Sequence, residues 1–372
     1  MVSATWITKA LDALRALKVE HRNYRTVMRR IAASCKAMFR GELLVLVGPP
    51  RVGKTRCVRE ALGIPQDPVP DDDEYMRVVI VEAGNESTSG EFSTKGFAMA
   101  CLRAIRHPVY GVAADDDPWE QKLDELLDRT PERRLWSAFQ RALIRRKTEY
   151  LIIDEAHHVS YVRGGPDAAA RVLDSWKCLA NTTKVKLVLT GSYDLLSLLR
   201  LATHLLGRQQ PLEFARYRSD SRADIEAWEQ LLRRFSELLR FQGTESLSSW
   251  NRMLFEGSMG RAGGLSLWIR TALAVMEAEG LISMTLEILE ATRLPALQEA
   301  AILQEIVEGE RNMLRFRATN SSAAGARGTE GKNDGHVGLQ MATQEETAGS
   351  KEKRKTVPFR RKPKRNAVNG RA

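Results

Sequence analysis

The chain has 372 residues, of which 43% are hydrophobic, and it carries 57 Lys and Arg against 47 Asp and Glu, a net charge of +10. No apolar stretch approaches the about 20 residues that cross a bilayer, and the N-terminal residues lack the continuous apolar core of a secretory signal. We therefore expect no membrane-spanning helix, no signal peptide and a cytoplasmic location.

Residues 1–40 predict one or two helices, and the chain after them alternates apolar runs with amphipathic stretches. Short branched-aliphatic runs predict strands buried on both faces at 43–47, 77–81, 150–153 and 185–189, with a fifth strand within 211–217. Helices are expected between them at 54–62, 94–106, 131–147 and 168–179, the third with Thr130 as its N-cap. This alternation predicts an α/β core with a mostly parallel five-stranded sheet over residues 41–217.

The first strand and the first helix of this core flank a phosphate-binding motif. The sequence there matches GxxxxGK[ST], in the strand-to-helix setting that a P-loop requires. Lys54 is expected to neutralise the β and γ phosphates, and the Thr55 hydroxyl to ligate Mg²⁺. The predicted nucleotide-binding residues are Gly48, Pro49, Pro50, Arg51, Val52, Gly53, Lys54, Thr55 and Arg56.

The catalytic half of the site is expected at the ends of two further strands. Asp154 would hold Mg²⁺, and Glu155 would orient or deprotonate the attacking water. Thr190, directly after another strand, is in the position of a sensor for the γ-phosphate, although a polar residue there can simply end the strand. Arg208 is a candidate finger that reaches the nucleotide of a neighbouring subunit, or else a solvated surface residue.

Two other classes of P-loop protein are weighed against this interpretation. Residues 154–157 spell the DEAH box of superfamily 2 helicases, but such helicases need a second α/β core, and the chain after Tyr217 has a helical pattern. A small-molecule or nucleoside kinase also uses a P-loop, and it predicts a monomer that is indifferent to DNA.

The C-terminal part divides into a helical and a basic segment. Residues 218–316 predict an all-helical lid, in which Arg261 of a glycine-rich turn is a candidate second nucleotide sensor. Residues 317–350 are rich in Gly, Ser, Thr and Ala and predict a flexible linker. Residues 351–372 carry ten Lys and Arg against one acid, so 317–372 is expected to be a disordered basic tail that binds a polyanion or an acidic partner, or only aids solubility.

Taken in this order, the P-loop, the Asp-Glu strand end, Thr190, Arg208 and the helical lid resemble those of an AAA+ ATPase. Within that class the chain is similar to the TnsC/TniB transposition regulators, relatives of the phage protein MuB. The similarity extends over residues 20–295 and includes the segments 93–102, 187–192 and 257–264. It implies ATP and Mg²⁺ as cofactors, a homo-oligomeric filament or ring on double-stranded DNA, and contacts with a transposase and a target-selector protein.

The resemblance also directs attention to the helix after the second strand. Thr94, Lys95 and Arg103 are the candidate DNA contacts, although Thr94 can also be read as an N-cap and the two cations as surface charge. A replication-initiator or helicase-loader ATPase is the alternative, which should carry a winged-helix or helix-turn-helix module after the lid. A nucleotide-switch signalling scaffold would need a long repeat array.

Overall fold

A computed structural model describes residues 2–16, 21–64, 75–84, 90–111, 127, 129–202 and 211–326. Arg208 and residues 327–372 lie outside these ranges. Within them, no helix combines the length and the hydrophobicity that a bilayer crossing requires.

The core is built on a five-stranded parallel sheet, as expected. The strands are β1 (Leu43–Val47), β2 (Val78–Glu82), β3 (Tyr150–Asp154), β4 (Lys186–Gly191) and β5 (Leu212–Glu213), in the order β2-β3-β4-β1-β5. Because all the strands are parallel, their carboxyl ends share one edge of the sheet. Asp154 and Gly191 end two neighbouring strands at that edge.

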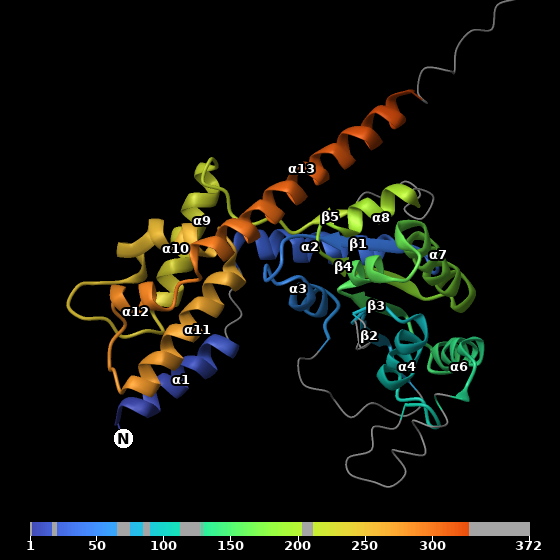
Figure 1. The fold of residues 1–372 in the computed structure, drawn as a ribbon, viewed down its shortest axis with the longest axis horizontal. Helices are drawn as coiled ribbons and strands as arrows, with labels where there is room; N and C mark the ends of the chain where they lie inside the picture. The colour runs from blue at the N-terminus through green and yellow to red at the C-terminus, as the bar shows by residue number, and fades with distance from the viewer. Residues whose placement is uncertain are drawn as a thin grey trace, which may run out of the picture. The chain divides into compact units, whose positions relative to one another are not determined.

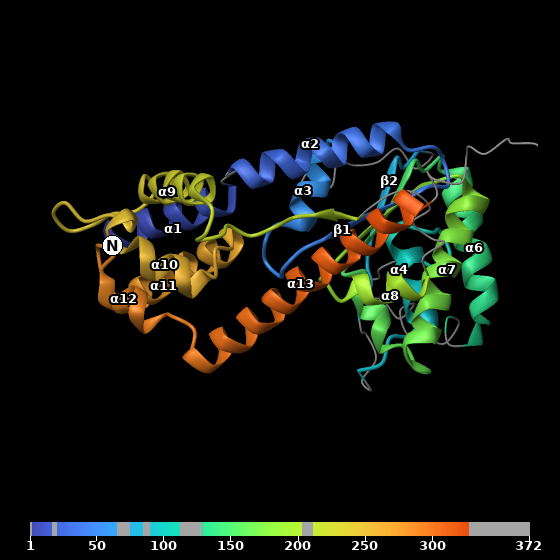
Figure 2. The same cartoon turned by 90° about the horizontal axis from the view of Figure 1, so that it is seen from above.

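Helices cover both faces of the sheet (Figures 1 and 2). On one face lie α4 (Thr94–Ala104), α6 (Glu132–Arg145), α7 (Gly165–Thr183) and α8 (Leu195–Leu201); on the other lie α2 (Arg22–Ala37) and α3 (Lys54–Ala61). Alternate residues of one strand enter the two cores, so Val45 faces the first set and Leu46 the second. This explains the uninterrupted apolar runs, since a strand covered on both sides has no polar face.

Two expected N-caps differ by one residue from the observed ones, although α4 begins at Thr94 as expected. The N-cap of α6 is Pro131 instead of Thr130, and the N-cap of α4 is Ser93 instead of Thr94. Ser93 has the extended backbone of a cap, and its hydroxyl accepts a hydrogen bond from the Gly96 amide at 3.0 Å. Thr94 is already helical, so the alternative reading of Thr94 as a cap is excluded.

The helical unit contains more of the chain than the lid segment predicted for it. It comprises α9 (Arg222–Ser236), the 3-10 turn η3 (Leu247–Trp250), α10 (Asn251–Ser258), α11 (Ala262–Glu279) and α12 (Leu286–Ala291). A second 3-10 turn, η1 (Ala156–Tyr161), is a short connection in the core. Helix α1 (Val2–Ala16) packs into the same apolar core through Ile7, beside Trp228 and Leu265. The N-terminal helices are therefore divided: α1 belongs to the lid and α2 to the sheet.

The last helix, α13 (Ala296–Ala326), runs from the lid back to the sheet (Figure 1). Its Met313 and Phe316 are buried in the core of the sheet, and Arg216 pairs with Glu310 at 2.8 Å. The linker was expected to begin at residue 317, inside this helix. Extending a helix that packing has already nucleated costs little, so a Gly- and Ser-containing sequence continues it for about ten residues here.

Candidate nucleotide site

Two glycines of the P-loop are required by its geometry. A Cβ on Gly48 would lie 2.4 Å from the carbonyl oxygen of Phe214, the residue after β5, so the loop can pass there only as glycine. Gly53 caps α3 with φ of 103°, a left-handed conformation that favours glycine. Between them Arg51 also has a positive φ, of 59°. The loop is thereby wrapped around the amino end of α3, where free backbone N–H groups favour phosphate.

Lys54 lies buried at the start of α3. Its ammonium donates to the carbonyl oxygens of Gly48 and Pro49, both at 3.1 Å, and burial lowers its pKa, opposed by the charges of Glu155 and Asp154. A buried cation bonded to neutral carbonyls is incompletely compensated. The lysine is thus prepared to pair with an anion such as a phosphate.

Asp154 is the centre of the site. One carboxylate oxygen accepts a hydrogen bond from the Thr55 hydroxyl at 2.5 Å; the other accepts from the Glu155 amide at 3.0 Å and from the Thr190 hydroxyl. Segments almost a hundred residues apart in sequence therefore meet at one carboxylate. Thr190 is fully buried, and its bond to Asp154 shows how it fixes the orientation of this acid. Its function as a γ-phosphate sensor remains a prediction.

Glu155 lies just beyond β3 in a left-handed conformation with φ of 49°. Such a backbone is costly for a residue with a side chain and often occurs at functional sites. Burial raises the pKa of its carboxyl group. Its Oε2 atom is 3.3 Å from Nδ1 of His157, which also accepts a hydrogen bond from the Ser192 amide at 3.3 Å. Burial lowers the pKa of His157 to about 4, so this contact is not an ion pair at neutral pH.

The donor set fits a magnesium ion held together with phosphates. The Thr55 hydroxyl and the Asp154 carboxylate are oxygen ligands of the kind that Mg²⁺ prefers, and Mg²⁺ usually takes one or two carboxylates and completes its shell with water and phosphate. Among the described residues, no cluster of three or more His, Cys, Asp or Glu is placed to bind a metal. A site with one hydroxyl and one carboxylate leaves the rest of the Mg²⁺ shell to phosphate and water, so it suits a metal that arrives with its nucleotide.

The lid contacts the P-loop through the glycine-rich turn that begins α11. Arg261 is buried there and donates to the Pro50 carbonyl at 3.3 Å and to the Ser258 carbonyl at 3.1 Å. Burial lowers its pKa, and the charge of Arg51 adds to this effect. A Cβ on Gly263 would lie 2.1 Å from the carbonyl oxygen of Arg51, so the lid approaches the loop backbone directly.

A cavity of about 120 Å³ lies where α2, the P-loop and the lid meet, and no local sequence pattern marks it. Its lining includes His21, Tyr24, Val52, Gly53 and Arg56, together with the lid residue Phe235. Burial lowers the pKa of His21 to about 4. Its Nδ1 is 2.6 Å from the Tyr217 hydroxyl and accepts from the Tyr24 amide at 3.4 Å, so the remaining ring nitrogen is the donor.

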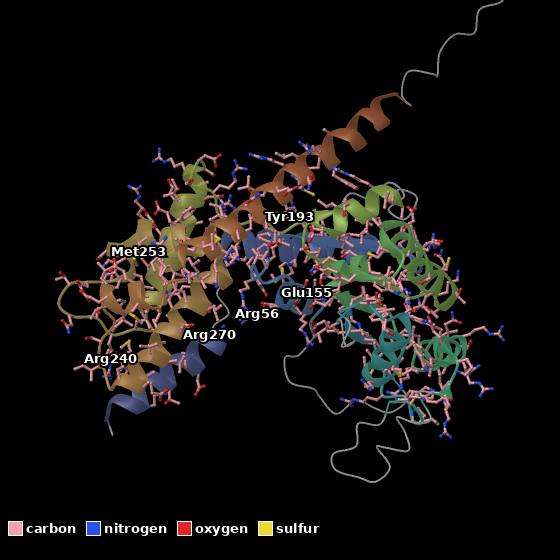
Figure 3. The ribbon with its side chains drawn as sticks, in the orientation of Figure 1. Arg56, Glu155, Tyr193, Arg240, Met253 and Arg270 are labelled. Atoms are coloured by element: carbon pink, nitrogen blue, oxygen red, sulfur yellow. The ribbon has the colours of Figure 1, made fainter. Side chains whose placement is uncertain are left out.

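Arg56 points from α3 toward the helical unit (Figure 3). One nitrogen of its guanidinium, Nη2, is buried without a hydrogen-bond partner. An unsatisfied buried donor beside an apolar cavity is costly unless a ligand supplies an acceptor. The cavity is accordingly suited to a flat heterocycle that carries acceptor atoms close to the P-loop.

The candidate DNA contacts lie apart from this cavity. Thr94 and Lys95 are in the first turn of α4 and Arg103 is in its last turn, where both cations have other interactions. The structure therefore does not single them out, and DNA contact through them stays a prediction. Arg208 is outside the described residues, so its role as a finger is also untested.

The sheet order, the P-loop and the acid after β3 define a P-loop NTPase domain with the AAA+ fold. Residues 37–199 match the family model described as an AAA domain. No curated protein matches the chain.

The solved structures that are similar to this chain have low sequence identity to it. The Aeropyrum pernix Orc1 protein in complex with DNA is 16% identical, with a TM-score of 0.50, over 74% of this chain and 65% of that one. Cdc6p from Pyrobaculum aerophilum is 12% identical, with a TM-score of 0.50, over 74% of this chain and 68% of that one. The Walker-type ATPase PABY2304 of Pyrococcus abyssi is 15% identical, with a TM-score of 0.43, over 78% of this chain and 75% of that one.

Proposed function

We propose that this chain is an ATP-dependent DNA-binding regulator of transposition, which assembles on duplex DNA when ATP is bound and disassembles on hydrolysis. The observation that carries the ATPase part is the 2.5 Å hydrogen bond that joins Thr55 of the P-loop to Asp154 of β3. It brings the expected metal ligands together beside Lys54. The DNA and transposition parts are supported by the resemblance to TnsC/TniB regulators.

In this proposal each residue has a distinct task. Lys54 exchanges its carbonyl partners for phosphate oxygens, and Thr55 and Asp154 hold the Mg²⁺ that offsets phosphate charge during transfer. Glu155 orients the attacking water and accepts its proton; the raised pKa of its carboxyl group makes it a stronger base. Bound between Val52, Tyr24 and Phe235, the adenine would fill the apolar cavity and meet donors from His21 and Arg56.

Oligomerisation would supply the affinity for duplex DNA that one subunit lacks. Residues 1–350 are nearly neutral, because the excess of positive charge is in residues 351–372. A single subunit should therefore bind duplex weakly, whereas an assembly repeats the same few phosphate contacts along the backbone. A trans-acting arginine such as Arg208 would then link assembly to hydrolysis.

Analytical ultracentrifugation and ATP turnover, each measured with and without duplex DNA, test this proposal. With ATP, Mg²⁺ and duplex, we expect the full chain to sediment as a large assembly, and its turnover to rise. A monomer whose turnover is indifferent to DNA would support the kinase alternative instead. Turnover with assembly only at particular origin-like duplexes would support the replication-initiator alternative.

A further inference from the structure

A second charged feature of the core is a groove far from the nucleotide site. Its charged lining residues are Arg106, Arg141, Arg145, Arg146 and Lys147, and the described lining contains no carboxylate. The helices α4 and α6 both end beside it, at Ala104 and Arg145.

The groove lies at the amino ends of the strands. The Met76 amide, which precedes β2, donates to the Arg146 carbonyl at 3.0 Å, and β3 begins at Tyr150, four residues after Arg146. Asp154 ends the same strand β3 at the opposite edge of the sheet. The groove is therefore separate from the P-loop and serves no step of nucleotide hydrolysis.

These five cations form no ion pair in the described part of the chain, although arginines elsewhere do, as Arg216 does with Glu310 at 2.8 Å. Arg146 donates from Nη2 to the Arg106 carbonyl at 3.0 Å, but its Nη1 is buried without a hydrogen-bond partner. A buried guanidinium nitrogen without a partner is costly, and an anionic ligand would satisfy it.

The cations also repel one another. Arg141 and Arg145 are one helical turn apart on α6, a like-charge spacing that destabilises a helix. Burial lowers the pKa of His107 in the same groove, and the positive charges of Arg141 and Arg146 lower it further. Among the described residues, the fold thus places positive charges together in this groove without a carboxylate in its lining.

Apolar side chains around the groove indicate the kind of anion. Tyr75, Pro108, Ala138 and Ala142 line it, and Tyr75 is 47% exposed. A phosphodiester backbone gains affinity from cations but gains nothing from covering these apolar groups. A ligand with both carboxylates and apolar side chains would use all of these groups, as arginine and tyrosine do at protein interfaces.

We propose that this groove binds an acidic segment of a partner protein, one in which Asp or Glu alternates with aliphatic or aromatic residues. Carboxylates of the segment pair with Arg141, Arg145 and the unsatisfied Arg146, while its apolar side chains cover Tyr75 and Pro108. The site is independent of the proposed ATPase activity, because none of these residues contacts the nucleotide site.

Fluorescence anisotropy on the full chain tests the proposal with a labelled peptide of alternating Asp and Leu that contains one Trp. Three comparison ligands of equal length are used: the same peptide with Asn for Asp, the same peptide with Gly for Leu and Trp, and single-stranded DNA. We expect the Asp–Leu peptide to bind more tightly than all three.

Charge reversal locates the binding. The double variant Arg141→Glu with Arg145→Glu should weaken binding of the Asp–Leu peptide at least about tenfold. The two new carboxylates would repel the Asp side chains of the peptide, which the arginines attract. The matched control is Arg133→Glu with Arg134→Glu on exposed positions of the same helix, outside the groove, and it should leave the affinity unchanged. Both variants should retain wild-type ATP turnover, which shows that they fold.

Three results would overturn the proposal. The first is that the Asp–Leu peptide does not bind the wild-type chain. The second is that the Gly-substituted peptide binds equally well, which would remove the apolar contribution. The third is that Arg141→Glu with Arg145→Glu abolishes DNA binding and leaves peptide binding intact, which would make the groove a nucleic-acid surface.

Discussion

At the scale of single residues, Lys54 and Glu155 should separate nucleotide binding from turnover. Lys54→Ala removes the buried ammonium beside the P-loop, so we expect nucleotide binding to be lost. Glu155→Gln keeps the shape of the side chain but removes the base, so binding should persist while turnover falls by about 10²–10⁴-fold. Nucleotide binding by fluorescence and phosphate release measure the two effects.

The control for both variants is Asp167→Asn, an acid exposed in the first turn of α7. It should change neither binding nor turnover. If Glu155→Gln hydrolysed ATP at the wild-type rate, another group would have to be the base.

His21 should make the stability of the fold depend on pH. Burial lowers the pKa of this histidine to about 4 from its ordinary 6.5, so the unfolded chain binds the proton more readily than the folded one. Stability should therefore be fully present above pH 6.5 and decline as the pH falls toward 4, by up to about 3 kcal/mol from this residue.

Urea unfolding at a series of pH values tests this expectation. His21→Gln should flatten the decline between pH 6.5 and 4, whereas Tyr217→Phe, which removes only the hydroxyl bonded to His21, should lower stability but keep the slope. An unchanged slope in His21→Gln would assign the pH dependence to other groups.

At the scale of elements, α13 depends on one close contact. A Cβ on Gly309 would lie 2.2 Å from Cδ2 of the Tyr193 ring, which is buried. Figure 3 shows Tyr193 beside this helix. Replacing glycine by alanine inside a helix normally stabilises it by about 1 kcal/mol, but here Gly309→Ala should destabilise the fold by about 1–3 kcal/mol.

Thermal and urea unfolding measure the sign of this change. Glu308→Ala, exposed on the same turn, is the control and should stay within about 0.5 kcal/mol of wild type. Replacing the Tyr193 ring by the smaller side chain of leucine, Tyr193→Leu, should remove most of the destabilisation that Gly309→Ala causes. A stabilised Gly309→Ala would mean that α13 does not rest on Tyr193.

The strands, and the motifs of the candidate site that flank them, could be read from the sequence for a common reason. A strand covered on both faces has an unbroken apolar sequence. The P-loop and the Asp-Glu pair are local sequence patterns at strand ends. Thus residues 43–47 were predicted as β1 with both ends correct. His21 and Tyr24 could not be found, because their cavity exists only where α2 meets the lid, and no local pattern marks a lone histidine or tyrosine. The groove near Arg146 could not be predicted either, because it forms only where the ends of α4 and α6 come together in the fold.

At the scale of the whole molecule, the domain boundaries were less predictable. That α1 joins the lid and that α13 returns to the sheet both depend on tertiary packing, which the helical periodicity of their sequences does not record. A truncation that removes the basic tail should accordingly end at Ala326, so that α13 remains whole.

Such a truncation tests what the basic tail does. Removing residues 327–372 deletes the ten Lys and Arg of 351–372, and we expect the affinity for duplex to fall and its dependence on salt to become shallower. ATP turnover without DNA should be unchanged. Filter binding at several salt concentrations measures the slope; a slope identical to that of the full chain would assign the tail to a protein partner.

The helix α13 packs against both the lid and the sheet, so it links the two. It contacts the lid near Gly257 through Glu299 and the sheet through Phe316, so a lid that swings about the nucleotide must carry this helix with it or release it. Leu297 and Leu314 on the same helix are 85% and 60% exposed. A protein that binds these two leucines in only one lid position would change the affinity of the chain for ATP. By reciprocity, ATP would change the affinity of the chain for that protein by the same factor.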